Sequence, residues 1–429
     1  MRNLKLLLWM FIFIAGSTFA EDLAEDKVTA LPGLRSISDT EYAGYATDKQ
    51  SNKLFYWFVA SHSPKSPIII WSNGGPGYTS LYGFFDETGP YKISTDLQLS
   101  ARKQAWSRFA NDLVIEQPAG TGLSDTPGNK IPTSPQQGIN QYFEALQYFF
   151  KLHPEYKNSP IYLSGESYAG TYLPLLSQKI LNYNKTTSAK INLKGLILIS
   201  PWADPIAQQS MDTAYAYYHG LITARQKEKL DQIYQQCNVL TKSKNSSKAN
   251  IVCGKIHDQI KAISNRYLIN IAYKSSGDNG NLRRYLMQPA VLRAIHATQS
   301  PDFKNSSEAV SNNYNDYIQV SMKSIYNQLL TDKLPIIIFS GLNDAKDTNF
   351  LGMQKFIASL SWPQKINYVK SERIAIMNPE ITHLALAYQK SGGYLTWITV
   401  LDAGHMVPQD QPDINMIVKN FIESPLRSR

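Results

Sequence analysis

Cysteine is scarce in this chain of 429 residues, which contains only Cys237 and Cys253. Neither cysteine lies in a CxxC pair or in another spacing typical of metal ligands, so we expect no metal site. In an oxidising compartment the two side chains can form one local disulfide that closes a short loop. Two buried free thiols are the alternative.

Concentrated charge is also lacking. Charged residues make up 18% of the chain, and the lysines behind the formal net charge of +9 are scattered. No stripe combines basic with aromatic residues, so we expect no nucleic-acid partner. The hydrophobic content of 43% is typical of an ordinary globular protein and excludes a disordered or fibrous chain.

Long hydrophobic runs are absent beyond the first 20 residues. Arg2 and Lys5 precede an apolar run at 6–15, and Thr18 and Ala20 place small residues where a signal peptidase reads. This pattern predicts that residues 1–20 are a secretory signal peptide, and hence a secreted or periplasmic protein. An uncleaved anchor is the alternative, but the run is too short to favour a spanning helix. We therefore expect no stable membrane insertion.

Several short runs rich in β-branched residues are typical of buried parallel strands. They cover residues 68–71, 113–115, 161–163, 196–199, 336–339 and 395–401. Residues 54–59 predict an antiparallel strand at the start of the sheet. A helix is expected from Pro135 to about Leu152, because Ser134 can cap it and proline suits its first turn. Strands that alternate with helices predict an α/β fold with a mostly parallel central sheet flanked by helices.

Residues 206–333 interrupt this alternation, because they lack convincing strands. They include a predicted helix at 224–236 and a lysine- and asparagine-rich segment at 241–250 that we expect to be an exposed loop. We interpret 206–333 as a helical cap inserted between two parts of the core, 42–205 and 334–429. Residues 21–41 then form an N-terminal extension. Peripheral helices without a role in binding are the alternative.

The run at 165–170, Gly-Glu-Ser-Tyr-Ala-Gly, follows a predicted strand and precedes a helix-compatible stretch. A serine between small residues at a strand-to-helix turn is the layout of a nucleophile elbow. The sharp turn lifts the Ser167 hydroxyl clear of the sheet, and only small neighbours leave room for it. An ordinary tight turn is the alternative interpretation.

A serine hydroxyl needs a base, and the base needs an orienting carboxylate. In an α/β-hydrolase these partners follow the serine in the order acid, then histidine, each after a later strand. His405 follows the predicted strand at 395–401, whereas His383 lies in a less patterned segment, so we favour His405. Asp344 follows the strand at 336–339, and Asp347 competes with it three residues later.

An acyl-transfer site also needs hydrogen-bond donors for the oxyanion. The backbone N–H of Tyr168, directly after the serine, is one expected donor. The second should follow an earlier strand, where residues 73–77 read Asn-Gly-Gly-Pro-Gly. Glycines there let the backbone approach a substrate closely. The spacing is not that of a phosphate-binding loop, and we expect no cofactor.

Taken together, these runs resemble those of the serine carboxypeptidases. The resemblance covers about residues 42–412, thinly between 207 and 282, and rests on five runs in order. They are Trp-Ser-Asn-Gly-Gly-Pro-Gly at 71–77, Phe-Asp-Glu-Thr-Gly-Pro at 85–90, Gln-Pro-Ala-Gly-Thr-Gly at 117–122, the run at 165–170, and Gly-His-Met-Val-Pro at 404–408. Five motifs in order are far more specific than any one of them.

The resemblance implies an α/β-hydrolase fold in which Ser167 is the nucleophile, Asp344 the orienting acid and His405 the base. It places the oxyanion donors at Gly75 and Tyr168.

It further implies that Asn73, Glu87 and Glu166 hold the C-terminal carboxylate of a peptide or protein substrate. Two glutamates repel such a carboxylate unless protons are shared, so at least one should have a raised pKa. Peptide hydrolysis should then work best in acid.

The chain departs from the family pattern at several positions. Tyr78 replaces a usual cysteine, Glu116 an aspartate, and Ile-Ser-Pro at 199–201 a Gly-Asn-Gly, while the turn after Asp344 is one residue longer. None of these changes removes a predicted catalytic group. The sequence thus predicts a secreted serine carboxypeptidase. The alternatives are an acyltransferase or esterase on the same scaffold, and a non-catalytic binding protein.

Overall fold

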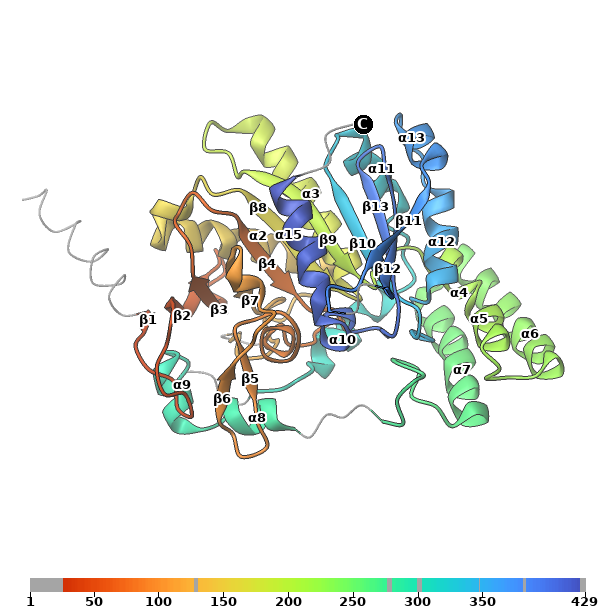
Figure 1. Cartoon of the computed structure of the whole chain (residues 1–429), viewed down its shortest axis with the longest axis horizontal. Helices are drawn as coiled ribbons and strands as arrows, with labels where there is room; N and C mark the ends of the chain where they lie inside the picture. Colours follow the sequence, from red (N-terminus) through yellow and green to blue (C-terminus); the bar gives the residue numbers. More distant parts are fainter. Residues whose placement is uncertain are drawn as a thin grey trace, which may run out of the picture.

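A computed structural model describes residues 26–126, 130–275, 280–298, 303–346, 348–380 and 383–424. Among these, eleven strands form one sheet in the order β1-β2-β3-β7-β4-β8-β9-β10-β13-β12-β11 (Figure 1). Its strands are β1 (Lys27–Val28), β2 (Thr40–Thr47), β3 (Lys53–Ala60), β4 (Ile68–Ser72), β7 (Asn111–Ile115), β8 (Ile161–Glu166), β9 (Leu193–Ile199), β10 (Ile336–Gly341), β11 (Arg373–Met377), β12 (Ala385–Gly392) and β13 (Leu395–Val400). A separate hairpin pairs β5 (Tyr91–Ile93) with β6 (Leu99–Ala101).

The centre of the sheet is parallel. Neighbours from β7 through β4, β8, β9 and β10 to β13 all pair in parallel. The flanking pairs β1·β2, β2·β3, β3·β7, β13·β12 and β12·β11 are antiparallel. The six predicted parallel strands and the antiparallel strand at 54–59 are therefore confirmed. Strands β1 and β2 precede this antiparallel strand in the chain, and both begin within the segment expected as an N-terminal extension.

Each central strand is buried on both faces, which explains its continuous apolar sequence. In β4, Ile68 and Ile70 pack into one core cluster while Ile69 and Trp71 pack into the other. Because successive side chains alternate across a strand, one sheet serves two hydrophobic cores.

Helices cover both cores (Figure 1). The first core contains residues of α2 (Pro135–Leu152), α3 (Ala169–Thr186), α11 (Lys323–Thr331) and α12 (Phe350–Ser359). The second contains residues of α8 (Asn281–Leu286), α9 (Pro289–Ala294) and α15 (Asn415–Glu423). The predicted start of α2 is confirmed, since Ser134 Oγ accepts a hydrogen bond from the Gln137 backbone N–H.

Only helices, and no strand of the sheet, lie between β9 and β10 in the part of the chain that the structure describes. Besides α8, α9 and α11 these are α4 (Pro205–Gln209), α5 (Asp212–Tyr218), α6 (Ala224–Lys242), α7 (Ser246–Ser264) and α10 (Glu308–Tyr314). Helices α5, α6 and α7 enclose a small core of their own, whereas α8, α9 and α11 pack onto the sheet's two cores. The inserted region is thus partly an outlying helical unit and partly a layer of the main domain.

The remaining short elements connect these layers. They are α13 (Lys365–Lys370), α14 (Val407–Asp410), and the single turns η1 (Gly83–Glu87), η2 (Trp106–Arg108), η3 (Pro154–Tyr156), η4 (Asn315–Tyr317) and η5 (Pro412–Ile414). Within the described ranges, no helix has the length and apolar character needed to cross a bilayer. The predicted signal peptide lies outside the described residues.

Candidate active site

Ser167 occupies a sharp turn between β8 and α3. Its φ angle is 60°, in the left-handed region that residues other than glycine rarely adopt. The turn is fixed at both ends, because Ser167 N donates to Ile199 O at 3.0 Å and Trp202 N donates to Ser167 O at 2.8 Å. A strained backbone held by its neighbours is a feature that clusters at functional sites.

The small residues around Ser167 are required by close packing. A Cβ atom on Gly165 would lie 2.3 Å from Ser72 O, and one on Gly170 would lie 2.5 Å from Pro201 Cβ. Neither position has room for a side chain without moving backbone or proline atoms. The backbone around Ser167 therefore has the sharp strand-to-helix turn of a nucleophile elbow.

Asp344 and His405 meet at the carboxyl ends of β10 and β13. Asp344 is fully buried, and its Oδ2 lies 2.8 Å from His405 Nδ1. Its Oδ1 accepts a hydrogen bond of 2.9 Å from the Lys346 backbone N–H. Of the competing residues, His383 is exposed, and Asp347 lies outside the described residues.

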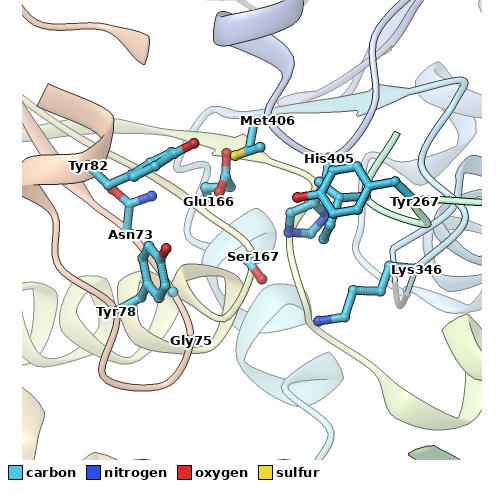
Figure 2. A pocket seen from close by; sticks show the side chains of 12 residues that line it. Asn73, Gly75, Tyr78, Tyr82, Glu166, Ser167, Tyr267, Lys346, His405 and Met406 are labelled. Atoms are coloured by element: carbon cyan, nitrogen blue, oxygen red, sulfur yellow. The ribbon is translucent and has the colours of Figure 1, made fainter. Parts of the chain in front are cut away.

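Ser167 and His405 line the same pocket, which has a volume of about 250 Å³ (Figure 2). The lining residues come from the loop after β4, the elbow, the inserted region and the loops after β10 and β13. They are Asn73, Gly74, Gly75, Tyr78, Tyr82, Glu166, Ser167, Tyr267, Ile269, Lys346, His405 and Met406. Segments far apart in the sequence thus surround one serine hydroxyl.

The loop after β4 packs directly against the elbow. A Cβ atom on Gly74 would lie 2.3 Å from Tyr168 N, so the two backbones touch there. Gly75 lines the pocket beside Ser167 and has a φ of 107°, a conformation that favours glycine. The backbones of Gly75 and Tyr168, the two predicted oxyanion donors, therefore belong to adjoining loops.

Glu116, which stands where the family usually has aspartate, anchors this loop. It is fully buried; Thr79 Oγ1 donates a hydrogen bond to its Oε1, and Ser80 N donates to its Oε2 at 3.0 Å. Ser80 Oγ in turn accepts a hydrogen bond of 3.1 Å from Asn73 N. Burial raises the Glu116 pKa to about 7. This glutamate supports the pocket wall from behind.

Asn73 is held in one orientation by donors to its side-chain oxygen. Trp71 Nε1 donates to Asn73 Oδ1 at 2.7 Å, and Gly83 N donates to the same atom at 3.1 Å. Asn73 Nδ2 therefore points away from these groups and lies 3.5 Å from Glu87 Oε1.

Glu87 and Glu166 are buried carboxyl groups that lie close enough for each to affect the pKa of the other. Burial raises the Glu87 pKa to about 7. Burial, and then the Glu87 charge, raise the Glu166 pKa well above its ordinary value. Ionising both carboxyls at once has a high cost in free energy, because two negative charges would then lie close together in a buried site. The pair therefore shares protons. Of the two, Glu166 reaches the pocket wall and Glu87 lies behind it.

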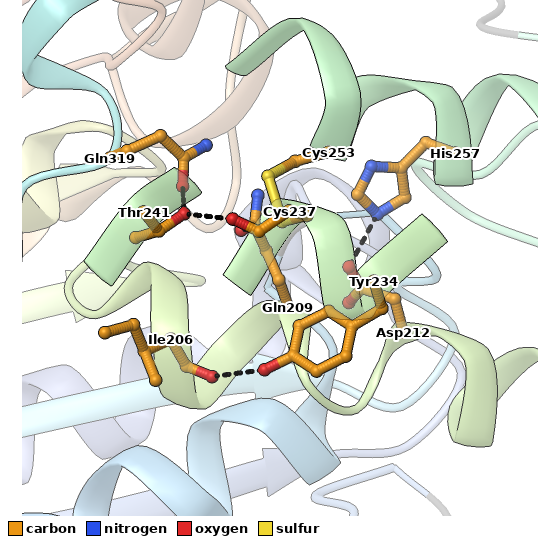
Figure 3. Close-up of a disulfide and its surroundings, with 9 residues drawn as sticks. All are labelled: Ile206, Gln209, Asp212, Tyr234, Cys237, Thr241, Cys253, His257 and Gln319. Carbon is orange, nitrogen blue, oxygen red and sulfur yellow. Dashed lines mark hydrogen bonds and ion pairs between the residues drawn. A yellow bond between two sulfur atoms is a disulfide. The ribbon is translucent and has the colours of Figure 1, made fainter. Parts of the chain in front are cut away.

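Cys237 and Cys253 form a disulfide between α6 and α7, with their Cα atoms 5.0 Å apart (Figure 3). The predicted disulfide is confirmed, and the alternative of two free thiols is wrong.

The prediction of an exposed loop at 241–250 is also wrong, because α6 continues to Lys242 and α7 begins at Ser246. Although the segment is polar, its Ala249 is fully buried beside the disulfide, so one face is covered. Only residues 243–245 form the turn.

Two further features were not predicted from the sequence. The first is a backbone strap from the inserted region: His405 N donates to Ile269 O at 2.7 Å, and Ala345 N donates to Leu268 O at 2.9 Å. This strap ties the histidine loop to the loop that carries Asp344. No local motif marks it, because its contacts join residues far apart in the chain.

The second is Thr348, which is buried beside the acid and the histidine. Its Oγ1 donates to Asp344 Oδ2 at 2.5 Å and lies 2.9 Å from His405 Nδ1. The hydroxyl therefore fixes both side chains. Because the turn after Asp344 is one residue longer than usual in the family, the sequence did not indicate which side chain would fill this position.

We expect Thr348→Val to lower kcat about tenfold while KM stays nearly constant, because a hydrogen bond to a charged group is lost. Steady-state kinetics on a blocked dipeptide measures both constants. Thr348→Ser, which keeps the hydroxyl, should restore kcat. Wild-type kcat in the valine variant would contradict a positioning role.

The described residues contain no cluster of three or more His, Cys, Asp or Glu side chains able to hold a metal ion.

The fold and the site define the class: a serine hydrolase of the α/β-hydrolase fold. A sequence model of the serine carboxypeptidase family matches residues 32–424. The chain belongs to this family and is a serine-type carboxypeptidase.

Similar proteins come from distant organisms. The chain is 30% identical over 390 residues to the venom serine carboxypeptidase of Apis mellifera, covering 87% of this chain and 82% of the relative. It is 29% identical over 430 residues to the pheromone-processing carboxypeptidase KEX1 of Phytophthora infestans, covering 93% and 71% of the two chains.

Among solved structures, KEX1(delta)p, a prohormone-processing carboxypeptidase from Saccharomyces cerevisiae, superimposes with a TM-score of 0.81 at 24% identity. The match covers 93% of this chain and 95% of the other. This likeness shows the fold.

Proposed function

We propose that this protein is a secreted carboxypeptidase that removes C-terminal residues from peptides through a Ser167–Asp344–His405 triad and an acyl-enzyme. The observation that carries the proposal is the convergence at one pocket. Ser167, on a backbone turn with φ 60°, shares that pocket with His405, which is hydrogen-bonded to buried Asp344.

In the proposed reaction, His405 Nε2 accepts the proton of Ser167 as its Oγ forms a bond to the scissile carbonyl carbon. The oxyanion formed in this step accepts hydrogen bonds from the backbone N–H groups of Gly75 and Tyr168. Collapse breaks the C–N bond, and the imidazolium gives its proton to the leaving amino group. Water then attacks the ester with His405 as base, and the peptide leaves one residue shorter.

The clamp consists of Asn73, Glu87 and Glu166, and we propose that it binds the C-terminal carboxylate of the substrate. Asn73 Nδ2 is one donor, and its orientation is fixed because Asn73 Oδ1 is engaged by Trp71 and Gly83. The raised pKa of the Glu166 carboxyl supports a protonated group that donates where an ionised group would repel. This chemistry favours hydrolysis of free C-termini in acid.

The test is release of amino acids from N-blocked dipeptides by the purified protein, measured between about pH 4 and pH 8. A phosphonate probe counts reactive serines in the same preparation. A reactive serine without any amino-acid release would overturn peptide hydrolysis. Faster turnover of esters than of peptides, or transfer of the acyl group to an added alcohol, would favour the alternative esterase or acyltransferase.

The clamp predicts a specific pH dependence. The ratio of kcat/KM for a blocked dipeptide to kcat/KM for its C-terminal amide should fall as pH rises above about 7, the raised pKa of Glu87, because there the Glu87–Glu166 pair begins to lose the proton that it shares. The sign follows because a raised pKa keeps the proton, and hence the donor, below that pH and loses it above. Dividing by kcat/KM for the amide removes the pH dependence that comes from the proposed triad, because the triad acts on both substrates.

Glu166→Gln should flatten this pH dependence, because an amide donates hydrogen bonds at every pH. We expect the ratio to vary less than about threefold across the range in this variant. Stopped assays with both substrates at each pH give the ratio. A ratio that titrates identically in the wild type and Glu166→Gln would contradict the clamp.

We propose secretion from the sequence of residues 1–20. The exported protein should begin at Glu21, which N-terminal sequencing of material from the medium or periplasm would establish.

A further inference from the structure

Arg102 is a buried arginine beside the segment that carries Glu87. Only 4% of the residue is exposed, and it directly follows β6. Because Tyr91 of β5 pairs with Ala101 of β6, the hairpin returns the chain to the end of the segment that it left. Burying a guanidinium has a high cost in free energy unless hydrogen bonds compensate for the lost water. The partners of Arg102 therefore indicate what the buried charge is for.

The Arg102 side chain donates three hydrogen bonds among the described residues, all to backbone carbonyls around Glu87. Its Nη2 donates to Phe85 O and, at 3.2 Å, to Tyr91 O, and its Nε donates to Gly89 O at 3.0 Å. Phe85 lies two residues before Glu87 and Gly89 lies two residues after it. The guanidinium thus holds the backbone on both sides of the glutamate.

Residues 85–91 need donors from elsewhere in the chain. The segment is the end of the single turn η1 followed by the short strand β5, and the last carbonyls of a helical turn have no partners within the turn. Backbone groups supply two donors: Arg102 N donates to Pro90 O at 2.7 Å, and Trp106 N donates to Thr88 O at 2.8 Å. The guanidinium supplies the other three bonds. Arginine suits this task because its N–H donors lie in one rigid plane, whereas lysine carries a compact charge on a flexible stem.

The Glu87 carboxyl depends on this backbone for its position. The residue is 1% exposed, so its side chain is confined by its surroundings. Its Oε1 lies 3.5 Å from Asn73 Nδ2, and its charge helps to raise the pKa of Glu166. A shift of the backbone at 85–89 would therefore move Glu87 relative to both other members of the clamp.

We propose that Arg102 is a positioning residue for the clamp: by holding the backbone on both sides of Glu87, it places the carboxyl pair that binds the C-terminal carboxylate of the substrate. The inference rests on the function proposed above, because it requires a clamp that binds this carboxylate. Arg102 acts from behind, since it lines a separate cavity of about 480 Å³ and not the pocket around Ser167.

The experiment measures the ratio of kcat/KM for a blocked dipeptide to kcat/KM for its C-terminal amide, in acid, with the purified protein. Arg102→Ala should lower this ratio about tenfold, the effect of losing hydrogen bonds from a charged group. The value of kcat/KM for the amide should change far less, because the amide has no carboxylate for the clamp to bind. A general loss of folded protein would lower both values together and leave the ratio unchanged.

Added guanidinium ions should restore the ratio in Arg102→Ala. The substitution leaves space for the free ion beside the second cavity, and the ion offers the same planar donors. The ion is added well below the concentrations that unfold proteins, and sodium chloride at the same concentration controls for ionic strength.

Arg108→Ala is the matched control. Arg108 is exposed and lines the same cavity, and its Nε lies 3.5 Å from Arg102 O. Its side chain makes no bond to residues 85–91 among the described residues, so the ratio should stay at the wild-type value with and without guanidinium.

Arg102→Lys covers the case in which the alanine variant does not fold. Lysine keeps the charge and the aliphatic stem but cannot reproduce the planar set of donors, so the ratio should fall in this variant as well. Equal losses for both substrates, a ratio that guanidinium leaves low, or failure of both variants to fold would overturn the inference. Failure of the proposed function looks different, because the wild type would then not prefer the free dipeptide to its amide.

Discussion

Ser167→Ala is expected to lower kcat/KM for a blocked dipeptide by about 10⁴- to 10⁶-fold, the largest effect of any single substitution in this chain. Alanine removes the Oγ atom that forms the acyl-enzyme in the proposed mechanism, while the pocket and the proposed oxyanion donors stay in place. The residual rate should come from substrate binding and the donors alone. Amino-acid release at high enzyme concentration measures the loss, and phosphonate labelling should disappear with it.

Ser164→Ala is the matched control. Ser164 lies three residues earlier in β8, and its buried Oγ has no hydrogen-bond partner among the described residues. Removing an unpaired buried hydroxyl costs little, so activity and melting temperature should stay close to wild type. More than about 1% of wild-type activity in Ser167→Ala, with a normal melting temperature, would contradict a nucleophilic Ser167.

The parallel strands could be predicted because each is buried on both faces and reads as an unbroken apolar run. The antiparallel edge at β11 and β12 could not. Arg373 and Ile374 of β11 are exposed, and β12 has a mostly half-buried pattern. Without a buried face, such strands carry no strong periodic signal, so the segment around His383 gave no indication of its structure.

The residues of the site also divide into those that the strand pattern predicts and those that it does not. Ser167, Asp344 and His405 each lie in the loop or turn after the carboxyl end of a strand, and the carboxyl ends of parallel strands share one edge of the sheet. Strand order alone therefore brought them together. Thr348 depends instead on the path of one turn, and the strap at Ile269 on how the inserted region folds back across the sheet edge. Those contacts depend on tertiary packing, which no local pattern encodes.

Asp344→Asn is expected to lower kcat about 10⁴-fold without unfolding the protein. In the proposed triad the carboxylate accepts the Nδ1 proton of His405 across the observed 2.8 Å, which leaves Nε2 unprotonated and free to take the serine proton. An asparagine can present its NH₂ group to Nδ1 and so stabilise the opposite tautomer, in which Nε2 carries the proton and cannot act as base. The loss should therefore fall on kcat more than on KM, measured with the same dipeptide.

Asp402→Asn serves as the control, because it makes the same aspartate-to-asparagine change at a position outside the proposed triad. Asp402 is exposed just after β13 and has a φ of 55°, a conformation that asparagine tolerates well, so this variant should keep its activity. Asp347→Asn tests the competing acid directly. If Asp344→Asn stays within tenfold of the wild type while Asp347→Asn loses activity, then Asp347 orients the histidine and the proposed triad is wrong. The 2.8 Å contact to fully buried Asp344 argues for the opposite result, because a buried carboxylate this close to an imidazole controls its tautomer.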